Sequence, residues 1–145
     1  MKDDRLFLIY SFEPFAVYEY TGGGLELVRG SPGQERGFPV RGSSPFIPWK
    51  EHFAGLTHSV TRIGEKLYYS HALVVLDDEF APVEESESFF IQHRGVEFVG
   101  GLIEYKGDLL VSYSVPDRGA AFCILPYSKV AQWVASVDEP GKGVG

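Results

Sequence analysis

Three segments of the chain repeat one pattern: a short apolar strand ends in a polar pair, breaks, and is followed by another apolar strand. The segments are residues 5–20, 53–76 and 108–125, and their polar pairs Tyr10-Ser11, His58-Ser59 and Tyr113-Ser114 stand 48 and then 55 residues apart. A recurrence near 50 residues, with several short strands in each unit, is typical of propeller blades. Since one blade cannot bury its faces alone, the pattern predicts stacked blades with polar strand ends gathered where the blades converge.

The length of the chain limits how many blades it can form. Its 145 residues are too few for a closed propeller, because even four blades of about 50 residues need more chain. We therefore expect an all-β fold, a partial β-propeller of about three blades built from antiparallel sheets, over residues 1–137, with a flexible tail at 138–145. Open apolar faces and strand edges would remain, which favours a homo-oligomer or a partner chain that completes the propeller.

Turn signals separate the expected strands at regular intervals. Strands are predicted at residues 6–10, 15–20, 25–28, 45–48, 53–60, 66–76, 88–92, 96–103, 108–114 and 119–125. One short C-terminal helix is predicted at 128–137, where Val130, Trp133, Val134 and Val137 follow helical spacing. Ser128 is its expected N-cap.

Charge and composition narrow the classes of partner. The net charge is −7 and the basic residues are scattered, which disfavours nucleic acid and anionic membranes. No stretch approaches the roughly 18 apolar residues of a membrane span, and the Met-Lys-Asp-Asp start has no hydrophobic signal region. We expect a cytoplasmic protein. Cys123, the single cysteine, lies in an apolar run and is interpreted as a small buried hydrophobe.

The segment Arg41-Gly42-Ser43-Ser44-Pro45 carries the densest polar chemistry of the sequence. The Arg41 guanidinium is a planar donor fork, and Gly42 lets the backbone approach closely, so Arg41 and Ser43 are candidates for holding an anionic or polyhydroxyl ligand. The alternative is a surface loop in which Arg41 pairs with an acid and the Ser-Ser-Pro sequence makes a turn.

Two of the four histidines, His58 and His71, lie inside apolar strands that a turn at residues 62–65 would pair. In one register they share a face of the sheet, and a slip of one residue separates them. A two-histidine metal site is one interpretation, but the sequence has no HxH or HExxH spacing. We favour a hydrogen-bonded structural or ligand-binding role, with no metal and no cofactor.

Two carboxylates, Glu97 and Asp117, lie on or after short strands. Buried or strand-end carboxylates serve glycosidases as acid and base, so both are catalytic candidates. The alternatives are an ion pair near Arg118 for Asp117 and, for Glu97, a carboxylate that accepts hydrogen bonds from neighbouring backbone amides.

Six motifs follow one another along the chain, at residues 41–45, 58, 68–71, 88–90, 95–102 and 111–117. In this order they resemble the C-terminal half of five-bladed β-propellers of the glycosidase clan, which includes the arabinanases and mannoside phosphorylases. The strongest likeness is to propeller domains associated with bacterial glycosyltransferases, and it spans residues 3–134. The early blades of the family have no counterpart here.

The resemblance implies a funnel that takes a carbohydrate or sugar phosphate. It adds Tyr69 and Tyr113 to Arg41, His58 and His71 as substrate-binding residues, with Glu97 and Asp117 among the groups lining the funnel. The predicted function is a carbohydrate-binding or carbohydrate-active domain that is not catalytic alone. Two alternatives stay open: a glycosidase or glycoside phosphorylase completed by a second chain, and a protein-interaction module without a ligand.

Overall fold

The structure is a computed structural model that describes residues 4–12, 14–31, 40–92, 94–116 and 118–136. Within these residues the chain is built from antiparallel strands and one short helix, α1 (Tyr127–Trp133). The predicted all-β class, with antiparallel sheets and a short C-terminal helix, is therefore confirmed. The expected tail at 138–145 lies outside the described residues, as does Asp117.

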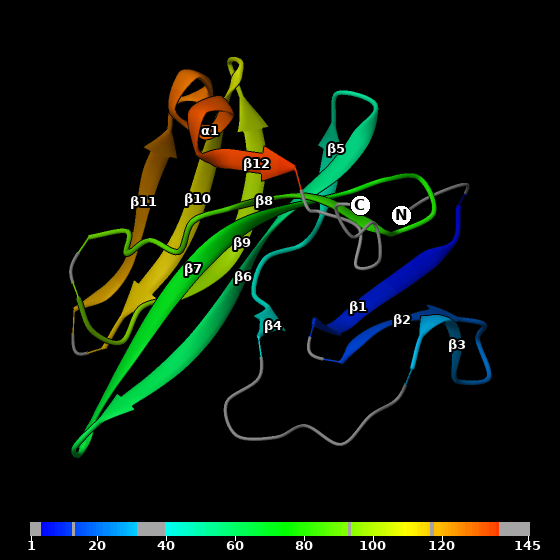
Figure 1. Cartoon of the computed structure of the whole chain (residues 1–145), viewed down its shortest axis with the longest axis horizontal. Helices are drawn as coiled ribbons and strands as arrows, with labels where there is room; N and C mark the ends of the chain where they lie inside the picture. The colour runs from blue at the N-terminus through cyan, green and yellow to red at the C-terminus, as the bar shows by residue number, and fades with distance from the viewer. Residues whose placement is uncertain (1–3, 13, 32–39, 93, 117, 137–145) are drawn as a thin grey trace, which may run out of the picture.

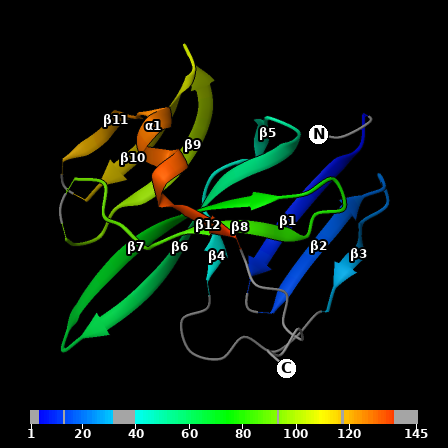
Figure 2. The same ribbon diagram turned by 45° about the horizontal axis from the view of Figure 1, so that its top comes forward.

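Nine of the described strands form one sheet, in the order β12-β8-β7-β6-β4-β1-β2-β3, with β5 paired to β6. The sheet curls into a half-barrel around the long β6–β7 hairpin (Figure 1, Figure 2). Its strands are β1 (Leu6–Phe12), β2 (Phe15–Tyr20), β3 (Leu25–Gly30), β4 (Arg41–Gly42), β5 (Ile47–Trp49), β6 (His52–Ile63), β7 (Lys66–Leu76), β8 (Pro82–Ser86) and β12 (Val134–Ser136).

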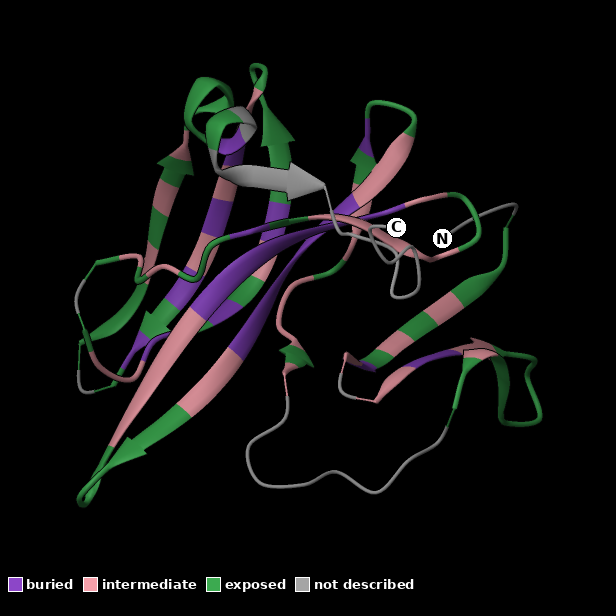
Figure 3. Ribbon diagram, viewed as in Figure 1, coloured by how far each residue is buried: buried purple, intermediate pink, exposed green. Residues whose placement is uncertain are grey.

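A second sheet contains β9 (Phe98–Tyr105), β10 (Asp108–Val115) and β11 (Gly119–Leu125), in the order β11-β10-β9. It packs against one face of the β6–β7 hairpin, where alternate side chains of both sheets form the core. Buried residues lie in the first half of β6, in the second half of β7 and at alternate positions of β10 (Figure 3). The core includes Leu56, Leu73, Val75, Val99, Leu102, Leu109, Val111 and Tyr113.

The three repeated segments each form an antiparallel hairpin: β1–β2, β6–β7 and β10–β11. This arrangement is consistent with a partial propeller-like fold. It differs from three separate blades in one respect, because the two-residue strand β4 pairs with both β1 and β6. That strand joins the first two hairpins into the single curled sheet.

Two regions, residues 82–92 and the C-terminal helix, depart from the sequence prediction, as does the unpredicted strand β4. The strand expected at 88–92 is reduced to a single bridge between Phe89 and His71. The strand that pairs with β7 is instead β8, which the sequence did not predict because it contains Pro82 and two glutamates. The helix ends at Trp133 rather than continuing to 137, because the next three residues pair with β8 as β12. The open edge of β8 thus gains a strand.

The start of α1 is also capped differently from the prediction. The Tyr127 amide donates to the Asp108 Oδ1 atom at 2.8 Å, so the cap comes from β10, and Ser128 lies inside the helix. Val130, the one helical core candidate whose side chain is described, is buried as expected. No helix in the described part of the chain has the length and apolar character needed to cross a membrane.

Candidate ligand-binding site

A row of directly opposed residues crosses the curled sheet from β1 to the bridge beyond β7. Ser11 pairs with Arg41, Arg41 with His58, His58 with His71, and His71 with Phe89. Directly opposed residues of antiparallel strands point to the same face. The structure therefore selects the register in which both histidines share a face, and it brings the predicted residue Arg41 beside them.

Exposure rises from His71 through His58 to Arg41, whereas Ser11, beyond Arg41 in this row, is buried. His71 is completely buried, His58 is 8% exposed, and Arg41 is exposed. The row thus places two buried imidazoles beside an exposed guanidinium. An exposed guanidinium can donate to hydroxyl, carboxylate or phosphate oxygens of a ligand.

Two aromatic rings flank His58. The Tyr69 ring stacks on the imidazole, with centroids 5.7 Å apart and planes at 15°. Phe98 meets it edge-on at 5.5 Å and is itself 45% exposed. Phe98 comes from the second sheet, so this aromatic cluster lies where the two sheets meet. Flat aromatic surfaces beside polar donors are a common means of binding a sugar ring.

Burial lowers the pKa of both imidazoles. For His58, the neighbouring His71 and the positive charge of Arg41 lower the pKa further. For His71, the backbone of Thr57 and the charge and backbone of Glu97 act in the opposite direction, yet burial dominates. Both imidazoles are therefore neutral near pH 7, and a neutral imidazole has one donor and one acceptor nitrogen.

The imidazoles are poorly satisfied by the described residues. The Nδ1 atom of His58 and both ring nitrogens of His71 have no hydrogen bond of good geometry to any described group. Buried polar groups usually have a partner, so these unpaired nitrogens are an unusual feature of the row, although the His58 Nδ1 atom is itself closed to solvent. No group of three or more His, Cys, Asp or Glu side chains suited to a metal ion occurs among the described residues.

The other predicted binding residues occupy structural positions. The Ser43 hydroxyl donates to the Val99 carbonyl at 2.8 Å and so links the curled sheet to β9. Tyr113 is buried, donates to Gln92 Oε1 at 3.3 Å, and has a pKa raised chiefly by burial. Cys123 is half-buried against the core, and burial raises the pKa of its thiol.

Glu97 is completely buried, and its carboxylate holds the loop that precedes β9. Its Oε2 atom accepts from the Ile91 amide at 2.9 Å, and Oε1 accepts from the Gln92 amide at 3.0 Å. This is the backbone-capping role that the sequence offered as the alternative to catalysis. The catalytic roles of Glu97 and Asp117 stay predictions, since Asp117 lies outside the described residues.

Sequence reasoning missed Phe98 and Phe89 as members of the site. Phe98 contacts His58, and Phe89 exchanges two backbone hydrogen bonds of 2.8 Å with His71. Phe98 follows Glu97 directly along the chain, and no local sequence pattern links it to β6. The signal that could have found it is the β9 alternation, which puts Val99 in the core and leaves Phe98 outside it.

Comparison of the chain with protein-family models, with curated proteins and with solved structures returns no match. The resemblance to glycosidase-clan propellers therefore stays a prediction from the six sequence motifs.

Proposed function

We propose that the chain is a carbohydrate-binding domain whose site is the cluster of Arg41, His58, Tyr69 and Phe98. The observation that supports it is the stacking of Tyr69 on a buried, neutral His58 beside an exposed guanidinium. The aromatic rings present apolar surface to the face of a sugar ring, while Arg41 and His58 form hydrogen bonds with its hydroxyl groups. A sugar phosphate fits the same chemistry through Arg41.

Binding to a glycan array, followed by calorimetric titration of the best glycan, tests this proposal. Arg41→Lys is expected to weaken binding roughly tenfold without a change in melting temperature, because lysine lacks the two-pronged donor fork. Arg62→Lys, at an exposed position on β6, the strand that carries His58, is the control and should leave affinity unchanged. The absence of any glycan ligand, or equal affinity in Arg41→Lys, would count against the proposal.

A second candidate function, the docking of another chain, is favoured by the outer face of β9–β11. Phe122, Ile103 and Ile124 are 72%, 53% and 51% exposed, and all three surround Leu110 and Ser112 on one face of this sheet. Exposed apolar patches of this kind mark interaction surfaces in soluble proteins. We propose that this face mediates self-association or holds a partner chain.

Self-association is expected to appear at micromolar concentrations in sedimentation velocity, with Phe122→Lys shifting the chain to monomer because a charge cannot be buried unpaired in the contact. Tyr20→Lys, an exposed aromatic position on β2, is the control and should not change the distribution. A wild-type chain that is monomeric at every concentration would argue against self-association through this face.

A further inference from the structure

A β-bulge in β9 turns the Phe98 side chain to the outer face of the second sheet. The register of β9 against β10 shifts at Gly100, which is the extra residue of the bulge. Without this extra residue, strand alternation would place Phe98 on the same face as the buried Leu102. With it, Val99 takes the core position and Phe98 is 45% exposed. Bulges are frequent next to functional sites, where they re-aim a side chain in this way.

A hollow of about 200 Å³ lies beside Phe98 on this outer face. It is lined by Phe98, Gly100, Ser112, Tyr113, Ser114 and Ala120, none of which carries a charge. The side chains of Phe122, Ile103 and Ile124, which are proposed for docking of another chain, do not line it. Its volume is below the roughly 300–1,000 Å³ of pockets for drug-sized ligands, so it accommodates one ring-sized unit.

Two serine hydroxyls of β10 border the hollow. The Ser112 hydroxyl lies over Gly101, since a Cβ atom at Gly101 would come within 2.5 Å of the Ser112 Oγ atom. Ser114 is directly opposite Phe98 on β9 and therefore shares its face. Among the residues that the structure describes, neither hydroxyl has a hydrogen-bond partner. A hydroxyl both donates and accepts, so the pair can bind the hydroxyl groups of an uncharged ligand.

Phe98 belongs both to this hollow and to the proposed carbohydrate site. Its ring meets the His58 imidazole edge-on, with centroids 5.5 Å apart, and it also lines the hollow beside Ser112 and Ser114. A ligand that covers the Phe98 ring can therefore contact the His58 cluster on one side and the two serine hydroxyls on the other. The two places are continuous through this one aromatic ring.

We propose that the hollow is a second sugar subsite, which holds an uncharged unit of an oligosaccharide whose first unit lies in the cluster of Arg41, His58, Tyr69 and Phe98. This inference rests on the proposed function and names its ligand class: an oligosaccharide of at least two units. Phe98 presents apolar surface to both units, and the serine hydroxyls bind the second. Two linked units bind more tightly than one, because the second binds as part of a molecule already held at the first.

The probes are D-glucose, D-galactose, D-mannose and D-xylose, together with disaccharides built from them, titrated calorimetrically into the full chain. At least one disaccharide is expected to bind at least about tenfold more tightly than either of its component monosaccharides. Disaccharides that bind no more tightly than monosaccharides would overturn the second subsite and leave the proposed function standing. A panel in which no sugar binds would overturn both.

Filling the hollow from either side is expected to remove this gain. A Cβ atom at Gly100 would have no other atom within 4 Å, and the φ of this glycine is not left-handed, so Gly100→Leu should fold and project into the hollow. Ala120→Leu fills the hollow from β11, the strand across β10 from Phe98. In both variants the affinity for the disaccharide should fall about tenfold, to that of the wild type for the monosaccharide. Unchanged disaccharide affinity in either variant would overturn the subsite.

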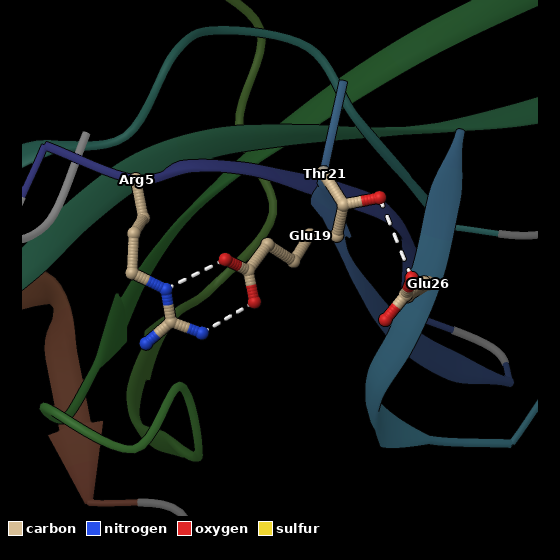
Figure 4. Close-up of polar contacts among 4 residues, drawn as sticks. All are labelled: Arg5, Glu19, Thr21 and Glu26. Atoms are coloured by element: carbon tan, nitrogen blue, oxygen red, sulfur yellow. Dashed lines mark hydrogen bonds and ion pairs between the residues drawn. The ribbon is translucent and has the colours of Figure 1, made fainter. Parts of the chain in front are cut away.

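Gly23→Leu is the matched control for these substitutions. Gly23 also has open space around it and lies in the β2–β3 turn, at the opposite end of the molecule from β9–β11 (Figure 1). The Thr21 hydroxyl donates to a Glu26 carboxylate oxygen at 3.4 Å across this turn (Figure 4). This variant should bind the disaccharide as the wild type does. Equal losses of affinity in Gly23→Leu and Gly100→Leu would contradict the assignment of the hollow.

Discussion

Replacing Glu97 with alanine is expected to lower the free energy of unfolding by about 4 kcal/mol, because two backbone amides then stay buried without an acceptor. The carboxylate accepts from the amides of Ile91 and Gln92 and is completely buried. Glu97→Gln keeps one acceptor oxygen but turns an NH₂ group toward the other amide, so its cost should be about 2 kcal/mol. Chemical denaturation with urea measures both values.

Glu104→Gln is the matched control, since Glu104 is exposed on β9, the strand that Glu97 precedes. It should change stability by less than about 0.5 kcal/mol. Equal stability of Glu97→Ala and the wild type would contradict the capping role. Turnover of aryl glycosides by the wild-type chain, lost in a folded Glu97→Gln variant, would instead support the enzyme alternative.

Stability is expected to fall as the pH drops below about 6.5, the ordinary pKa of histidine. The folded-state pKa values of His58 and His71 are lowered by burial, so below that pH the unfolded chain binds protons that the folded chain does not. The stability that the two neutral imidazoles contribute is therefore complete above the ordinary pKa of histidine. It is lost as the pH falls toward the lowered pKa values of the folded state. Each unit of lowering corresponds to about 1.4 kcal/mol for each histidine.

Urea denaturation at several pH values between about 7.5 and 5 measures this dependence. His71→Leu removes one titrating group at similar volume and should flatten the curve. A free energy of unfolding that stayed constant, or rose, as the pH fell through this range would contradict the conclusion that His58 and His71 are buried and neutral.

The sequence predicts the hairpins well because each is a local feature. Alternating apolar runs and the turn near Gly64 specify β6 and β7 with little reference to the rest of the chain. The pairing of His58 with His71 could only be narrowed to two registers, since a slip of one residue preserves the local pattern. The packing of Leu56 and Leu73 against the second sheet selects one of these two registers.

Features that depend on distant residues could not be predicted. The contact of Phe98 with His58 arises from the packing of β9 beside β6, and the cap of α1 comes from Asp108 on β10. The pairing of β12 with β8 converts three residues of a helical pattern into a strand, because a sheet edge can override local propensity. The capping role of Glu97 was among the sequence alternatives, but its partners follow from the loop conformation.

The most direct test of the proposed carbohydrate site is the NMR response of the histidine ring resonances to the best glycan found on the array. We expect the His58 ring signals to shift on titration, while those of His52, at the far end of β6, do not. Tyr69→Ala should reduce the affinity obtained from these shifts roughly tenfold, and Tyr10→Ala, an exposed tyrosine on β1, should not. Glycan-induced shifts that leave His58 unchanged would contradict the assignment of the site.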